Sequence, residues 1–294
     1  MKHEDFATIK KCDSWQELCE KHDNFCLKKG KIWVFRGQKN AAWDLKTTFE
    51  RLTDIVTDIV KRKNIPSFEF GLLRKFKREF SLYSKRIAKD DDLIEWFSLM
   101  QHYGTPTRLL DWTYSFYVAT FFALEDIENE NESAIWAIET KWLEHKLFKK
   151  CSSCKKLLRR DLNLQKKESL KTIINKLVVA KVNPYYVHER LSVQQGCFLF
   201  PGDTTQSFLD NLLGLAGTKK ELKNNLIKFV VTEKKTEKRA ILEDLFRMNI
   251  TRTSLFPGID GYAASLKVAA FILPETLKPG TEYREFIKGV VRKS

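Results

Sequence analysis

The sequence predicts an α+β fold in which a mixed central sheet is surrounded by many helices. Apolar residues recur at helical spacing over 49–60, 68–87 and 236–248. Short apolar or alternating runs typical of strands lie at 31–35, 133–139, 196–200 and 227–231. Hydrophobic residues make up 43% of the chain, which is enough for a sizeable packed core.

Local signals place several helix ends. Residues 14–17 read Ser-Trp-Gln-Glu, a capping box that begins a helix, and Gly30 lies near its end. Acidic residues at 90–92 suit the first turn of another helix, which stops at Gly104. An apolar helix is expected over 115–124.

The domain organisation is predicted to be a single elaborated domain over 1–294. Residues 141–181 form a basic, helical insertion in this interpretation. No run approaches the roughly 18–20 apolar residues of a membrane span, and the first eleven residues lack the apolar stretch of a secretory signal. We therefore expect a cytoplasmic protein with no membrane partner.

The net charge of +14 is unevenly distributed. Residues 141–180 contain twelve lysines and arginines against three acidic residues, a surplus of nine. Nucleic acid is the natural electrostatic partner of such a segment, although a solvated lysine-rich surface is an equal alternative. The residues expected to contact phosphates are Lys149, Lys150, Lys155, Lys156, Arg159 and Arg160.

The sequence predicts no metal site. Cys151 and Cys154 form a C-x-x-C pair, but a structural zinc site normally needs a second pair, and the five histidines are scattered. The Walker A, dinucleotide-binding, H-E-x-x-H and G-x-S-x-G signatures are absent from the sequence.

The first candidate site motif is Phe35-Arg36-Gly37-Gln38. An arginine at the end of an apolar strand is held on a rigid element, and its planar fork suits phosphate or carboxylate. Gly37 allows another backbone or a ligand to approach closely. The alternative is that Arg36 ties the strand end to a nearby carboxylate.

The second motif is the polar stretch 101–113, between apolar helices. Arg108 and Asp111 are close enough to pair or to share a ligand. Gln101 and His102 lie at a helix C-terminus, where the dipole favours a charged histidine. Thr113 is expected to cap the next helix. A buried Arg–Asp pair that holds the loop is an equal alternative, because such networks are common structural devices.

A third stretch, 189–198, places Gln194 and Gln195 before Gly196 and a predicted strand. The two amides could order polar ligand atoms, or they could make hydrogen bonds at a strand edge.

Together these motifs resemble the FRG domain family, named for its Phe-Arg-Gly motif. The resemblance covers FRGQ at 35–38, QHYGTPTRLLDWT at 101–113, Arg190 with Gln194 and residues 196–198, and SLFPGIDG at 254–261. The closing motif departs from the family at Asn249, often a glycine, and at Gly258, usually an aspartate. The family is mostly uncharacterised and is often associated with mobile or antiviral gene neighbourhoods.

The chain also has a remoter likeness to ADP-ribosyltransferases, which implies an ADP-ribosyltransferase-like core. Those enzymes place an Arg or His on a first strand, a Ser/Thr/Tyr motif before a helix, and a Glu ahead of a late strand. Arg36, the stretch 107–123 and Gln194-Gln195 follow that order, with glutamine in the place of the glutamate.

The resemblance implies an NAD-dependent, ADP-ribosyltransferase-like effector in toxin or antiviral defence, with an antitoxin or defence-system protein as its partner. Arg36 would hold the NAD phosphates, and Asp111, or else Glu189, would stabilise charge developing on the ribose. The residues expected to be catalytic are Arg36, Arg108, Asp111 and Gln194. Those expected to bind the cofactor are Arg36, Gly37, Gln38, Gln101, His102, Tyr103, Thr107 and Thr113.

Two other hypotheses stay open on the sequence. The chain could be a non-catalytic, basic nucleic-acid-binding protein. It could also be a regulatory protein in which the polar motif only holds the fold together.

Overall fold

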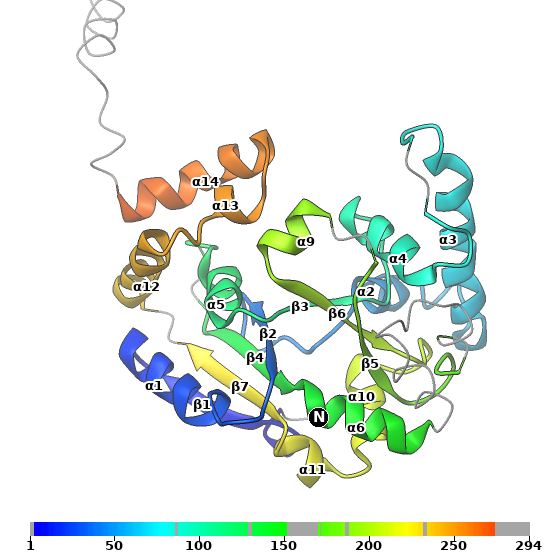
Figure 1. The fold of residues 1–294 in the computed structure, drawn as a ribbon, viewed down its shortest axis with the longest axis horizontal. Helices are drawn as coiled ribbons and strands as arrows, with labels where there is room; N and C mark the ends of the chain where they lie inside the picture. The colour runs from blue at the N-terminus through cyan, green and yellow to red at the C-terminus, as the bar shows by residue number, and fades with distance from the viewer. Residues whose placement is uncertain are drawn as a thin grey trace, which may run out of the picture.

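A seven-stranded mixed sheet forms the centre of the protein, with strand order β1-β7-β4-β2-β3-β6-β5 (Figure 1). The computed structural model describes residues 3–85, 88–128, 131–151, 170, 172–185, 188–231 and 234–273. Neighbouring strands are antiparallel except for β1 and β7, which are parallel. The strands are β1 (Thr8–Cys12), β2 (Trp33–Gln38), β3 (Leu110–Thr113), β4 (Ser133–Glu139), β5 (Val179–Val182), β6 (Gly196–Pro201) and β7 (Leu226–Val231).

Helices surround this sheet, so the predicted α+β class is confirmed. Side chains of Ser14, Asp92 and Ser115 accept hydrogen bonds from backbone N–H groups at three helix starts, as capping residues do. The α-helices are α1 (Trp15–Cys26), α2 (Thr48–Ile55), α3 (Ile65–Phe80), α4 (Leu93–His102), α5 (Phe116–Leu124), α6 (Thr140–Lys150), α9 (Glu189–Val193), α10 (Phe208–Ala216), α11 (Lys219–Lys223), α12 (Lys235–Arg247), α13 (Arg252–Leu255) and α14 (Ile259–Ile272).

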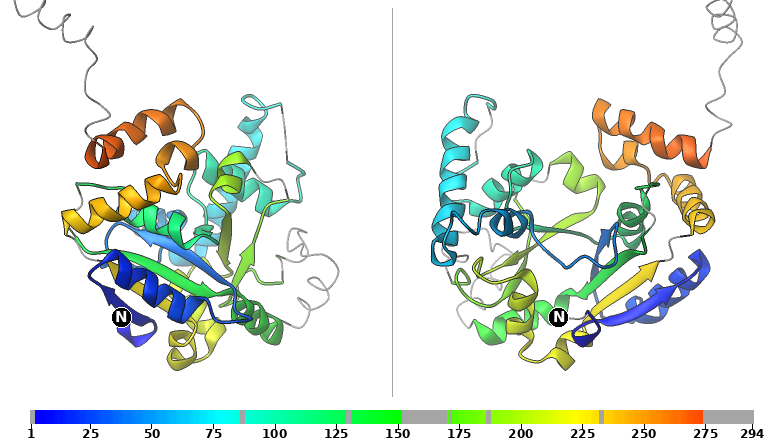
Figure 2. Two further views of the ribbon diagram at one scale, coloured as in Figure 1. Left: turned by 60° about the vertical axis from the view of Figure 1, so that its left-hand side comes forward. Right: turned by 180° about the vertical axis from the view of Figure 1, so that it is seen from behind.

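Apolar side chains cover both faces of the sheet. All seven residues of β4 are buried, as expected for a central strand with cover on each side. One core includes Phe35 of β2 with residues of α1, α5 and α12, and the other includes Val34 with residues of α4, α6 and α10. Figure 2 shows α1 and α12 together beside the β1–β7 end of the sheet. No helix among the described residues is both long and apolar enough to cross a bilayer.

The sheet opens between β2 and β3. Their register holds one pair, Phe35 with Thr113, whereas β2 pairs with β4 along six residues and β3 with β6 along four. Residues 36–38 and 110–112 therefore run past each other without strand pairing. This opening gives the two strand segments room to line a cavity between them.

Three strands were not expected from the sequence: β1, β3 and β5. Residues 110–113 were interpreted as part of a polar loop, but they form β3, which is only four residues long and mixes apolar with polar side chains. The segment 141–181, expected to be helical, begins in α6 but ends in β5, at the edge of the sheet. Residues 152–169 and 171 lie outside the described residues.

Candidate functional site

A cavity of about 730 Å³ lies at the opening between β2 and β3. Residues of β2, the following loop, α2, β3, α5 and α9 line it. Its charged lining residues are Arg36, Lys39, Asp44, Lys46, Arg51, Asp111, Glu125 and Arg190. Cavities of this volume are typical of small-molecule and cofactor sites.

The cavity carries more unpaired positive charge than negative. Asp44 bonds His3 at 2.8 Å, and Glu125 pairs with Arg252, so both carboxylates already have partners. Within the described part of the chain, Arg51 and Arg190 form no ion pair; Arg51 donates to the Lys46 carbonyl, and Arg190 lies 4.3 Å from the Phe256 ring centre. Guanidinium groups without carboxylate partners favour an anionic ligand.

Arg36 projects from β2 at the opening. Its Nη1 donates to the backbone oxygen of Asp111 at 2.7 Å and lies 4.0 Å from Asp111 Oδ2. Burial lowers the pKa of the Arg36 guanidinium; Asp111 acts in the opposite direction, and Arg51 lowers the pKa further. An anion in the cavity would relieve the unfavourable burial of this charge.

Two hydrogen-bond donors in the cavity wall are unused. Nε of Arg36 and Nε1 of Trp112 are buried and have no hydrogen-bond partner in the described part of the protein. Trp112 is only 3% exposed. Buried donors without partners cost free energy, and both atoms are shielded from solvent rather than open to the cavity.

A short hydrogen-bond relay holds the Asp111 carboxylate at the cavity edge. Gln101 Nε2 donates to Asp111 Oδ1 at 2.7 Å, and the Thr107 hydroxyl donates to Gln101 Oε1. The hydroxyl therefore fixes which end of the Gln101 amide faces Asp111. The Asp111 side chain is 62% exposed, so its second oxygen stays accessible.

Gly37 serves the packing of α5 on β2. A Cβ at this position would lie 2.1 Å from the Ala119 carbonyl oxygen and 2.6 Å from the Ala123 nitrogen. Only glycine lets the helix backbone come this close. Gln38 is 6% exposed and uses its amide internally, accepting from Trp136 Nε1 and donating to the Asp44 carbonyl. Both residues line the cavity, but their first role is structural.

Arg108 does not share the site with Asp111. It is 1% exposed and binds Glu69 through Nε and Nη2, and its Nη1 donates to the Gly202 carbonyl at 3.0 Å. The expected Arg108–Asp111 pair is therefore wrong, and a buried Arg108–Glu69 pair takes its place. Neither Arg108 nor Glu69 lines the cavity.

Four predicted residues, His102, Tyr103, Thr107 and Glu189, do not line the cavity. Thr107 is fully buried, and Tyr103 and His102 line smaller cavities near α3 and α9. Burial, with Arg190, lowers the pKa of His102, which opposes the charged form that the helix dipole was expected to favour. Glu189 is exposed and does not line the cavity.

Thr113 and Gln194 join β3 to α9. Thr113 Oγ1 donates to the Gln194 backbone oxygen at 2.7 Å, and Gln194 Nε2 donates to the Leu255 carbonyl. Both residues line the cavity, with their polar groups used internally. Ser115, not Thr113, caps α5.

The basic segment is only partly described. Lys149 is exposed, and Lys150 donates to the carbonyl oxygens of Leu177 and Gly214. Lys155, Lys156, Arg159 and Arg160 lie outside the described residues. In the ranges that the structure describes, no cluster of three His, Cys, Asp or Glu side chains could hold a metal ion.

Sequence reasoning did not assign Arg51, Trp112 and Arg190 to the site. Trp112 lies inside the polar motif 101–113, Arg190 lies in the stretch 189–198, and Arg51 lies downstream of the motif at 35–38. Their positions in those stretches were the available signal, but one sequence does not show which side chains reach a common cavity.

Comparison with known proteins gives one family. The FRG domain model matches residues 31–132, which include Arg36, Gln101 and Asp111. No curated protein and no solved structure matches this chain. The protein that surrounds this arginine-lined cavity therefore contains an FRG domain, whose segment 31–132 supplies β2, β3 and most of the cavity wall.

Proposed function

We propose that the cavity between β2 and β3 binds NAD and that the protein is an ADP-ribosyltransferase-like effector in toxin or antiviral defence. One observation carries the proposal. Arg36, Arg51 and Arg190 converge on a single cavity, where Arg51 and Arg190 form no ion pair within the described residues. Beside them lies the accessible Asp111 carboxylate, 4.0 Å from Arg36 and held by a hydrogen-bond relay.

The cavity suits the parts of a dinucleotide. The charge and planar donor forks of Arg36 and Arg51 suit the two linked phosphates. Trp43 is 53% exposed in the lining and offers a flat face for stacking.

Bound NAD would supply an ADP-ribosyl group whose bond to nicotinamide breaks as positive charge develops on the ribose. Asp111 is the carboxylate placed to stabilise that charge, because a preorganised anion helps most where charge appears. Gln101 orients Asp111, and Thr107 orients Gln101. Arg108 has no part in this scheme, since Glu69 occupies it.

The test is to measure NAD binding by calorimetry and nicotinamide release by chromatography. We expect Asp111→Asn to bind NAD within a few-fold of the wild type and to lose release by about 100-fold or more, the loss typical of a removed electrostatic stabiliser. Arg36→Gln should weaken binding by about tenfold or more, since a hydrogen bond to a charged group is removed. Asp58→Asn, on an exposed residue, is the matched control.

An absence of NAD binding at millimolar concentration would contradict the proposal. So would unchanged nicotinamide release by Asp111→Asn. The defence role is tested separately: wild-type protein expressed in bacteria should arrest growth, and Asp111→Asn should not. An antitoxin partner is expected to restore growth by binding the protein.

A further inference from the structure

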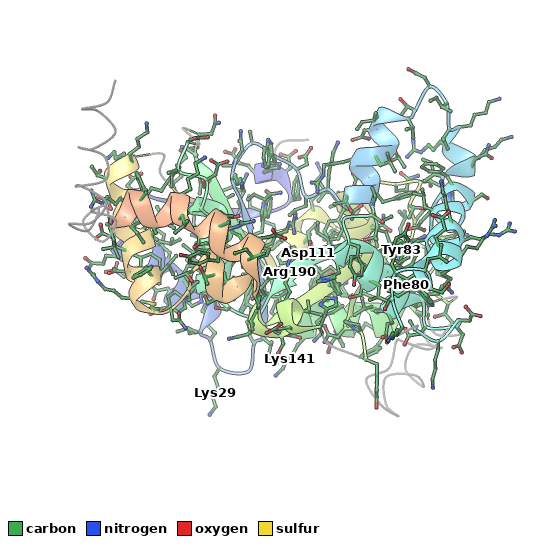
Figure 3. All side chains as sticks on the ribbon, turned by 90° about the horizontal axis from the view of Figure 1, so that it is seen from above. Lys29, Phe80, Tyr83, Asp111, Lys141 and Arg190 are labelled. Carbon is green, nitrogen blue, oxygen red and sulfur yellow. The ribbon has the colours of Figure 1, made fainter. Side chains whose placement is uncertain are left out.

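A second cavity, of about 380 Å³, lies between α3 and α4 and is separate from the arginine-lined one. We call it the aromatic slot; its walls come from Leu72, Phe76, Phe80, Tyr83 and Tyr103. In Figure 3, Phe80 and Tyr83 lie together on the α3 side of the molecule, away from Asp111 and Arg190. The proposed NAD site does not use any of these aromatic residues.

The rings of the aromatic slot are arranged around a buried floor. Phe80 is 6% exposed and packs against Phe76 with ring centres 5.2 Å apart. Tyr103 lies against Phe80 at 5.9 Å, in a tilted orientation. Tyr83 and Tyr103 are 84% and 61% exposed, so two large rings remain in solvent at the mouth. Such an apolar slot with exposed rings suits a flat aromatic ligand.

The helix that forms one wall of the slot is rich in basic residues. Helix α3 carries Arg74, Lys75, Lys77 and Arg78 against Glu69 and Glu79, and Lys77 pairs with Asp90. Glu69 is already neutralised by Arg108 in the core.

The charge reaches the mouth of the slot. Lys75 lines the slot, and Arg78 is its i+3 neighbour on α3. Both are exposed, and neither has an acidic partner among the residues that the structure describes. Glu79 is the one acid in the lining, and its carboxylate could accept a hydrogen bond from an exocyclic amino group.

We infer that α3 and the aromatic slot bind single-stranded nucleic acid, with one base stacked in the slot and the phosphates along Lys75 and Arg78. Stacking rings beside a cationic surface are the recurring elements of single-strand binding. An acidic peptide would match the charge, but it has no regular supply of flat rings for the slot. The site is independent of the proposed NAD chemistry, and it lies outside the basic segment 141–181.

The test is fluorescence anisotropy with a labelled ten-nucleotide single strand at several salt concentrations. Charge reversal by Lys75→Glu and Arg78→Glu together should lower the affinity by more than tenfold. The slope of log affinity against log salt should shrink by about 1.4, since each lost phosphate contact on a single strand contributes about 0.7. Tyr83→Ala should lower affinity by about fivefold or more through lost stacking.

The matched control is Lys28→Glu with Lys29→Glu, which changes the net charge equally. Both lysines are exposed, and Figure 3 shows Lys29 far from Phe80 and Tyr83. Equal loss of affinity in the control and the α3 variant would overturn the inference, as would unchanged binding in both. Competition by poly-glutamate at the same phosphate-equivalent concentration would also overturn it in favour of an acidic protein partner. Circular dichroism establishes that every variant is folded.

Discussion

Replacing Arg108 by methionine separates a residue that stabilises the fold from a residue of the site. Arg108 Nε lies 2.7 and 3.0 Å from the two Glu69 oxygens, and the side chains are 1% and 0% exposed. The Arg108→Met variant would leave the Glu69 carboxylate buried without its partner. The side-chain volume is roughly kept, so the charge is the main change.

The expected loss in the free energy of unfolding is about 3–5 kcal/mol, the cost of breaking a buried ion pair from one side. Natural domains have only about 5–15 kcal/mol in total, so this loss is large. Arg108→Met combined with Glu69→Leu removes both charges and should cost less than the single change. Lys267→Met breaks an exposed pair with Glu128 and should cost less than about 1 kcal/mol.

Denaturation in urea, followed by circular dichroism, gives these free energies, and NAD binding is measured on the folded fraction. We expect folded Arg108→Met to keep the binding of the wild type, because the residue does not line the cavity. A stability loss under 1 kcal/mol together with lost NAD binding would refute the structural assignment of Arg108 and return it to the site.

Three further outcomes are expected. Gly37→Ala should lower the melting temperature markedly, because a Cβ there meets the α5 backbone at 2.1 Å. Gly71→Ala, in open space on α3, should instead stabilise the protein by up to about 1 kcal/mol. Equal effects of the two changes in differential scanning calorimetry would refute this. Burial raises the pKa of Glu50 from 4.5 to about 7, so the folded state holds this proton more tightly than the unfolded state. The free energy of unfolding should therefore fall between about pH 4.5 and 7, by roughly 3 kcal/mol at most, and Glu50→Gln should remove that fall; parallel pH–stability curves would contradict it. If the basic segment binds nucleic acid, reversing the charges of Lys155, Lys156, Arg159 and Arg160 should weaken binding and flatten its salt dependence, and unchanged anisotropy curves would exclude that role.

Much of the fold was readable from local pattern. The helices α2, α4, α5 and α12 and the strands β2, β4, β6 and β7 lie where periodicity and capping residues predicted them. These elements are long or strongly apolar, and their signals depend on neighbours within a few residues. The strands β1, β3 and β5 have four or five residues each, too few for a clear alternation.

The sequence predicted where the candidate site lies, but not which residues line it. Arg36 and Asp111 meet as expected, and Gln101 joins them. Arg108, three residues from Asp111, instead enters the core toward Glu69. Arg108 precedes β3, whereas Asp111, Trp112 and Thr113 lie on β3 and line the cavity.

The sequence by itself determined the α+β class, the ends of the strong helices and the two motifs that meet at the cavity. Tertiary structure alone decided that β2 and β3 part after Phe35, that Arg51 and Arg190 reach the same cavity, and that α3 carries a basic surface beside an aromatic slot. The physical reason is the separation along the chain over which each kind of interaction acts. Capping and periodicity act over one or two turns, whereas strand pairing and cavity lining join residues from tens to more than a hundred positions apart, whose partners no local pattern specifies.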